Sequence, residues 1–123
     1  MESIRRIVPN INTRQMEASR KFYSEIIGLK AAMDMEWIVT LVSPDNPTAQ
    51  ISLVLANEDQ LRQQGMSLTI EVADVDAVYS KVLKNDISII YPMTDEPWGV
   101  RRFHIADPNG VVLNIMSHIA KTV

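Results

Sequence analysis

The side chains best suited to chemistry gather near the C-terminal end of the sequence. Arg102 and His104 stand two apart in an alternating segment, so they should share one face of a β-strand, with Phe103 and Ile105 on the other. Guanidinium can pair with anionic groups, and imidazole can transfer protons near neutral pH. Trp98, just before this segment, offers a planar surface on which an aromatic ligand could stack. We therefore expect a sheet with one apolar face against helices and one face equipped for binding.

Other alternating segments add polar side chains to faces of this kind. In residues 67–73, for example, polar residues alternate with apolar ones. Aromatic plates, methionine and a few polar groups are typical of small-molecule sites. The candidate ligand-binding residues are Trp98, Trp37, Arg102, His104, Asn10, Ser67, Thr69, Asn114 and Met116.

Alternative interpretations remain open for most of these residues. Glu71 and His104 could form an acid–base pair or a displaced metal pair and are the candidate catalytic residues, although His104 can also be an ordinary strand histidine. Arg102 can simply form a structural ion pair with Glu71. Trp98 and Trp37 can serve packing or a dimer interface.

Composition narrows the class of protein. The 123 residues fit one domain, and the net charge of −3 without a basic stripe argues against nucleic-acid binding. Cysteine is absent, which excludes disulfides, thiolate catalysis and Cys-ligated metals and suits a reducing cytoplasm. We expect no signal peptide, because the N-terminus lacks an apolar region, and no membrane span, because no apolar run approaches roughly 20 residues. We therefore predict a cytoplasmic protein.

The order of expected elements repeats along the chain. A polar stretch, expected to be a linker with one helical turn, separates two successions of strand, helix and three strands. The expected strands and helices cover residues 4–12, 16–27, 29–35, 36–43, 49–56, 67–73, 74–84, 87–93, 100–106 and 111–116. This internal repeat predicts one domain over residues 1–123, with module 1 about 1–57, a linker at 58–65 and module 2 about 66–123.

Two motifs give the chain a family resemblance. Residues 18–29, ASRKFYSEIIGL, are similar to the pattern S..FY...LG, and residues 96–110, EPWGVRRFHIADPNG, are similar to PWG...F...DPNG. Together and in this order, they resemble the vicinal oxygen chelate superfamily, which includes glyoxalases, bleomycin-resistance proteins and extradiol dioxygenases. The resemblance implies an α+β fold in which two βαβββ modules form a cupped mixed sheet with helices outside. It also implies a homodimer.

The resemblance further implies a divalent metal held by His or Glu on the first and last strand of each module. These positions fall on Val8, Ser67 and Asn114, and near Gln50 or Ser52. None is His or Glu, and neutral hydroxyl and carboxamide oxygens compensate poorly for the dehydration of a divalent cation. We therefore expect no metal and no other cofactor, and no metal-dependent catalysis.

Three functions follow as hypotheses. The first is a metal-free binding protein that holds an aromatic or apolar compound in the cup, as antibiotic-sequestering members of the superfamily do. The second is a lyase or isomerase that uses a relocated metal or Glu71 and His104 as acid and base. The third is an interaction module in which the fold is only a scaffold. We favour the first.

Overall fold

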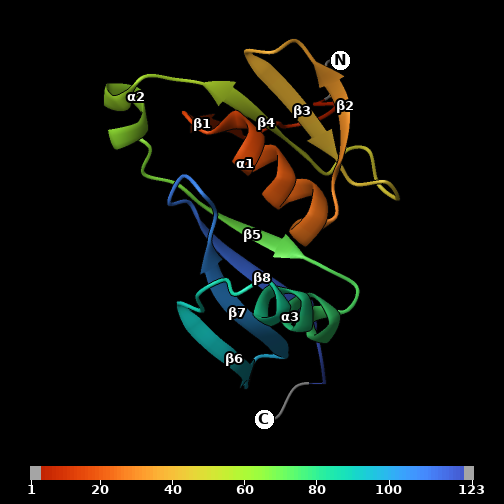
Figure 1. Cartoon of the computed structure of the whole chain (residues 1–123). Coiled ribbons are helices and arrows are strands. Elements are labelled where there is room, and N and C mark those ends of the chain that lie inside the picture. Colours follow the sequence, from red (N-terminus) through yellow and green to blue (C-terminus); the bar gives the residue numbers. More distant parts are fainter. Residues whose placement is uncertain (1–3, 121–123) are drawn as a thin grey trace. The chain divides into compact units, whose positions relative to one another are not determined.

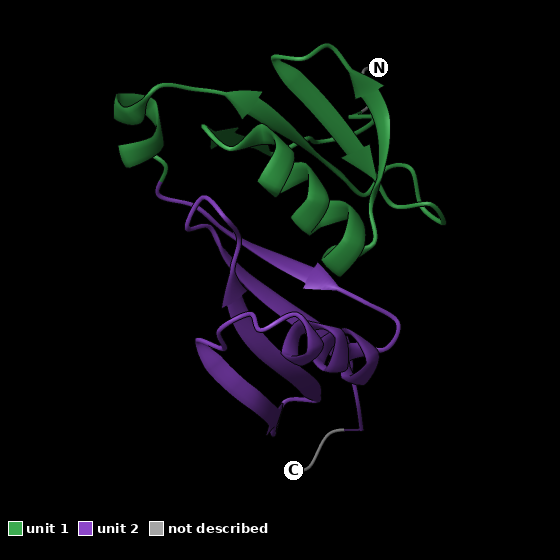
Figure 2. Ribbon diagram, viewed as in Figure 1, with its two compact units in different colours: residues 1–64 green, residues 65–123 purple. Residues whose placement is uncertain are grey.

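The computed structural model describes residues 4–120. The chain divides into two compact units, Met1–Gln64 and Gly65–Val123 (Figure 2). Within the described residues each unit contains a strand, a helix and three further strands, which confirms the predicted α+β fold with two βαβββ modules. No helix in this part of the chain has the length and apolar character needed to cross a membrane.

Unit 1 is a mixed sheet with a helix on one face (Figure 1). Its described strands have the order β1-β4-β3-β2, with β1 parallel to β4 and the other pairs antiparallel. The elements are β1 (Asn10–Thr13), α1 (Met16–Lys21), its π-helical continuation η1 (Phe22–Ile27), β2 (Lys30–Asp34), β3 (Ile38–Val42) and β4 (Gln50–Leu55). The helix ends at Gly28, whose φ of 95° suits glycine. Ile11, Tyr23, Leu41 and Leu53 are completely buried in the core.

A short helix, α2 (Glu58–Arg62), lies within the stretch predicted as a linker. Asn57 caps it: the side chain of Asn57 accepts a hydrogen bond from the Gln60 amide, and the side chain of Gln60 accepts one from the Asn57 amide. This reciprocal capping box satisfies two backbone donors, so the predicted single helical turn is confirmed.

Unit 2 repeats the arrangement with strand order β5-β8-β7-β6. Its elements are β5 (Ser67–Glu71), α3 (Val75–Lys84), β6 (Tyr91–Glu96), β7 (Val100–Ala106) and β8 (Val112–His118). Asp74 caps α3, because its carboxylate accepts a hydrogen bond from the Ala77 amide at 3.1 Å. Phe103 and Ile105 are completely buried, and the ring of Tyr79 on α3 meets that of Phe103 edge-on at 5.0 Å. The apolar face of the sheet therefore packs on α3, as predicted.

The turn between β7 and β8 is fixed by one buried carboxylate. Asp107 is 5% exposed, and its Oδ1 accepts hydrogen bonds from the amides of Asn109 and Val111 at 2.8 and 2.9 Å. Gly110 has φ of 83°, a left-handed conformation that favours glycine. This turn sets the register in which β7 and β8 pair.

Two strands predicted from the sequence have different bounds in the structure. The first strand begins only at Asn10, because Pro9 lacks an amide hydrogen and contributes only its carbonyl, which accepts from the Ser52 amide. The strand predicted over residues 87–93 is β6, which starts at Tyr91 and continues to Glu96.

Candidate functional site

The open face of the sheet in unit 2, opposite α3, is the candidate functional site. Strand pairing aligns its side chains in rows that run across the sheet. One row joins Thr69, Asn114, His104 and Tyr91 through successive pairings of β5, β8, β7 and β6. The next row joins Glu71, Met116, Arg102 and Thr94 in the same way.

These rows bring together most of the residues singled out in the sequence. Because side chains alternate between faces, residues 102 and 104 lie on the face opposite the buried Phe103 and Ile105. Ser67 lies at the end of the same face, paired with Val112. The predicted sharing of one face by Arg102 and His104 is therefore confirmed, and strand register places Ser67, Thr69, Glu71, Asn114 and Met116 on that face too.

Arg102 lies at the centre of a charged and aromatic cluster. Its Nε donates to Oε2 of Glu96 at 2.9 Å, and its Nη2 lies 2.8 Å from the same oxygen in an ion pair. The hydroxyl of Tyr91 donates to the same oxygen at 3.0 Å. The guanidinium carbon lies 5.3 Å from the Tyr91 ring centroid and 5.4 Å from that of Trp98. Glu96 therefore neutralises Arg102, and the guanidinium lies within cation–π distance of both Tyr91 and Trp98.

Trp98 is the exposed member of this cluster. It belongs to the tight turn between β6 and β7, where the Gly99 amide donates to the Glu96 carbonyl at 3.1 Å and Gly99 has φ of 96°. The indole is 55% exposed although it contacts the guanidinium of Arg102. An indole held in this way presents apolar surface to a planar ligand.

His104 continues the cluster along β7. Its ring lies 4.9 Å from the Tyr91 ring in a tilted arrangement. Burial, and then repulsion by the Arg102 guanidinium, lower the pKa of His104 below its ordinary value of 6.5, although the Asn114 side chain and the Glu96 charge act in the opposite direction. The imidazole is therefore neutral at pH 7.

Asn114 pairs directly with His104 across the two strands. Its Nδ2 donates to Oγ1 of Thr69 at 3.3 Å, which identifies Oδ1 as the free end of the carboxamide. Among the described residues, 4–120, neither Asn114 Oδ1 nor His104 Nε2 has a hydrogen-bond partner, although both atoms are buried. A buried polar atom without a partner is unusual and marks this pair as a candidate contact for a ligand.

The ion pairs suggested by the sequence are different in the structure. Glu71 does not pair with His104. Its Oε2 lies 2.9 Å from Nδ1 of His118, the last residue of β8. Arg102 pairs with Glu96 rather than with Glu71. The cause is strand register, which places Glu71 opposite Met116 and leaves His104 opposite Asn114. The acid–base pair of Glu71 and His104 is therefore not formed.

Sequence reasoning missed Glu96 and Tyr91. The strand that carries them was predicted to end at residue 93, so Glu96 lay outside the predicted strand. The motif at residues 96–110 does indicate the missing partner. A tight turn at 97–99 makes β6 and β7 a hairpin, and the alternation of side chains then places Glu96 and Arg102 on the same face.

The remaining candidates lie in unit 1. Asn10 begins β1 and pairs with Ser52, and Trp37 follows β2 as a 54% exposed side chain. Val8, a predicted position of a metal ligand, precedes β1.

The residues at the family's usual metal positions do not fit a divalent cation. Val8 has no donor atom, and Ser67 and Asn114 offer only neutral oxygens. Ser52 shares a 2.7 Å hydrogen bond with Thr40, and the Gln50 side chain contacts Arg6 and the Pro47 carbonyl. Over residues 4–120, no three His, Cys, Asp or Glu side chains gather closely enough to hold a metal ion. Hard and borderline cations need carboxylate or imidazole ligands, so these positions offer them too little.

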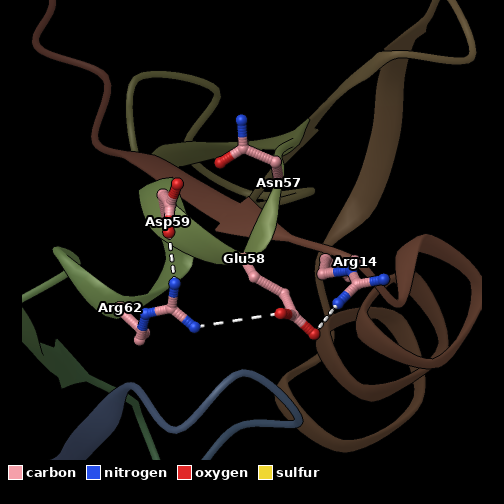
Figure 3. Close-up of a pocket in the computed structure, with 5 residues that line it drawn as sticks. All are labelled: Arg14, Asn57, Glu58, Asp59 and Arg62. Carbon is pink, nitrogen blue, oxygen red and sulfur yellow. Dashed lines mark hydrogen bonds and ion pairs between the residues drawn. The ribbon is translucent and has the colours of Figure 1, made fainter.

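A depression of about 450 Å³ beside α2 is lined by Arg14, Asn57, Glu58, Asp59 and Arg62 (Figure 3). Glu58 forms ion pairs with Arg14 and, at 3.8 Å, with Arg62, which also pairs with Asp59. Because these exposed charges neutralise one another in water, the depression offers a ligand little beyond weak surface ion pairs.

The chain matches known proteins in sequence pattern and in fold. The family model described as Glyoxalase/Bleomycin resistance protein/Dioxygenase superfamily matches residues 3–115. The chain belongs to this superfamily. The match spans both βαβββ modules, so the resemblance recognised from the two motifs is confirmed.

Several solved structures share the superfamily fold. A protein of unknown function from Agrobacterium tumefaciens str. C58 has a TM-score of 0.77 at 22% identity, with 97% of this chain and 98% of that chain covered. TnmS3, an antibiotic binding protein from Streptomyces sp. CB03234, has a TM-score of 0.76 at 20% identity, with 96% and 98% covered. A bleomycin resistance determinant encoded on the transposon Tn5 has a TM-score of 0.74 at 16% identity, with 94% and 98% covered. No curated protein matches the chain significantly.

Proposed function

We propose that this superfamily member is a metal-free binding protein that holds an aromatic or apolar small molecule on the open face of unit 2. The observation that carries this proposal is the half-exposed Trp98 indole, backed by the Arg102 guanidinium that Glu96 holds in place. A side chain fixed before binding loses little conformational entropy when a ligand stacks on it.

The electrostatics of the cluster favour a ligand without a negative charge. Arg102 is already neutralised by Glu96, and Tyr91 donates to the same carboxylate. The pairing of Arg102 with an anionic ligand, which the sequence allowed, would therefore require breaking this ion pair. An uncharged planar body on Trp98 requires no such change.

Two further observations support a binding role over metal-dependent catalysis. The usual metal positions provide only neutral oxygens or none, so the Lewis acid on which the superfamily's metal chemistry depends lacks ligands here. Glu71 bonds to His118, which weakens the alternative of a lyase or isomerase with a Glu71/His104 acid–base pair. Similar folds include an antibiotic binding protein and a bleomycin resistance determinant, in keeping with this choice.

Calorimetric titration with a panel of bicyclic and polycyclic aromatic compounds tests the proposal. We expect saturable binding of at least one compound by the native chain and its loss in Trp98→Leu. Ile90→Ala is the control, because Ile90 is an equally exposed apolar side chain of unit 2 outside the cluster. Equal binding by native protein and Trp98→Leu, or no binding across the panel, would refute the proposed role of Trp98.

We also propose a homodimer located in the cytoplasm. The exposed side chains of Met33, Met35 and Trp37 around the β2–β3 connection are apolar, and such side chains are frequent in protein interfaces. The lack of cysteine suits a reducing compartment. Light scattering after size-exclusion chromatography should give twice the mass of one chain, and a monomer mass at micromolar concentration would contradict the dimer.

A further inference from the structure

The open face of unit 2 contains a second feature beside the Trp98 cluster. His104 Nε2 and Asn114 Oδ1 are the buried side-chain polar atoms that lack a hydrogen-bond partner among residues 4–120. They belong to directly paired residues of β7 and β8. Two unrelated packing defects would have no reason to occur side by side, so we treat the two atoms as one feature.

The neighbouring polar groups are already engaged. The other end of the Asn114 carboxamide donates to Thr69, and both Arg102 and Tyr91 donate to Glu96. These contacts leave the two atoms with no competitor but each other: the Asn114 side chain acts on the pKa of His104, yet the two atoms form no hydrogen bond. A buried polar atom that stays unbonded destabilises the folded state, so a group from outside the chain that bonds to both would bind favourably.

This polar pair is continuous with the aromatic platform. Trp98 contacts the Arg102 guanidinium, which lies over the Tyr91 ring, and the Tyr91 ring in turn lies 4.9 Å from the ring of His104. One planar ligand could therefore stack near Trp98 and extend a polar group toward Asn114. The two features define an apolar and a polar part of one site.

The chemistry of the pair selects the polar group. Asn114 Oδ1 only accepts hydrogen bonds, so it repels a carboxylate and requires a donor from the ligand. The imidazole of His104 is neutral, and Arg102 nearby opposes additional positive charge. A neutral group with an N–H donor beside a carbonyl acceptor satisfies both protein atoms, provided that Nε2 carries the imidazole proton.

We propose that His104 and Asn114 form a polar subsite for the neutral amide-type group of a ligand, such as a lactam, whose planar body stacks on Trp98. The proposal rests on the proposed binding function and adds the chemical class of the group that is recognised. In this arrangement the ligand N–H donates to Asn114 Oδ1, and its carbonyl accepts from His104 Nε2–H.

Three probes of nearly the same shape test the subsite. 2-Quinolone has both the N–H and the carbonyl, 1-methyl-2-quinolone keeps only the carbonyl, and quinoline has neither. Calorimetry with the native chain should show that 2-quinolone binds at least about tenfold more tightly than either of the other probes. A probe that leaves one buried polar atom without a hydrogen bond should lose affinity by about that factor.

Variants assign this preference to the two residues. Circular dichroism first confirms that Asn114→Leu and His104→Phe are folded. In each variant, we expect 2-quinolone to bind no more than about twofold more tightly than the other two probes, because one of the two hydrogen bonds that produce the tenfold preference is lost. His118→Phe is the matched control, because it removes an exposed imidazole from the same sheet, and the preference should survive in it.

The outcomes separate the subsite from the proposed function. If all three probes bind equally to the native chain, the amide subsite is overturned while binding on Trp98 stands. The same holds if the preference for 2-quinolone persists in both variants. If none of the probes binds, both the subsite and the platform are overturned for bicyclic ligands.

Discussion

Replacing Glu96 with Gln should expose how much the central cluster depends on one carboxylate. Oε2 of Glu96 accepts hydrogen bonds from Arg102 Nε at 2.9 Å and from Tyr91 at 3.0 Å, and it lies 2.8 Å from Arg102 Nη2 in the same ion pair. The substitution keeps the size of the side chain and removes its charge. The Arg102 guanidinium then keeps its aromatic neighbours but loses its counter-charge.

The magnitude follows from burial. Breaking a fully buried ion pair costs about 3–5 kcal/mol, because one charge is left uncompensated. Here the Glu96 side chain is 10% exposed, but that of Arg102 is 25% exposed, so water can replace part of the lost interaction. The carboxamide that replaces the carboxylate still has an oxygen that can accept a hydrogen bond. We therefore expect Glu96→Gln to lower the free energy of unfolding by about 2 kcal/mol.

Urea unfolding followed by circular dichroism measures this change. The double variant Glu96→Gln/Arg102→Met should be less destabilised than Glu96→Gln alone, because it no longer leaves a guanidinium unpaired. Asp95→Asn is the control: it removes the carboxylate of the neighbouring, exposed ion pair with Arg101 and should have a far smaller effect. A loss below about 0.5 kcal/mol in Glu96→Gln would refute the reasoning, since surface substitutions fall in that range.

Three further predictions concern other parts of unit 2. The pKa of His104 is lower in the folded chain than in the unfolded chain, so the unfolded chain takes up the proton first as the pH falls. The free energy of unfolding should therefore decrease as the pH drops below 6.5. Urea unfolding at pH 7 and at pH 5 should show a smaller decrease in His104→Phe than in the native chain. Ser117→Ala should cost about 1–2 kcal/mol in urea unfolding, because the buried hydroxyl bonds two backbone groups; an effect no larger than that of the exposed Ser80→Ala would contradict this. Asp107→Ala should cost about 2 kcal/mol in thermal unfolding by removing two amide hydrogen bonds, and an unchanged melting temperature would argue against that role.

The faces of the strands could be predicted because alternation alone determines them. Once residues 100–106 were assigned to a strand, the separation of Phe103 and Ile105 from Arg102 and His104 followed from geometry. The helix ends at Gly28 and Asp74 are equally local features, since each depends on the conformation or side chain of one residue.

The partners within the site could not be predicted in the same way. They depend on register between strands that are distant in sequence, and register decides that Glu71 meets His118 while His104 meets Asn114. The partner of Arg102 was missed for a smaller reason: ending a strand three residues early removed Glu96 from the sheet. Which ligand atoms meet His104 and Asn114 depends on chemistry outside the chain.

Binding by the metal-stripped protein tests the central claim most directly. The Trp37→Phe chain leaves Trp98 as its only tryptophan, so quenching of its fluorescence reports ligands on the platform. A planar aromatic ligand found by calorimetry should quench this fluorescence to saturation, with the same affinity in EDTA and after addition of Zn²⁺, Ni²⁺, Mn²⁺ or Fe²⁺. Quenching that disappears in EDTA and returns with one stoichiometric metal would contradict the account.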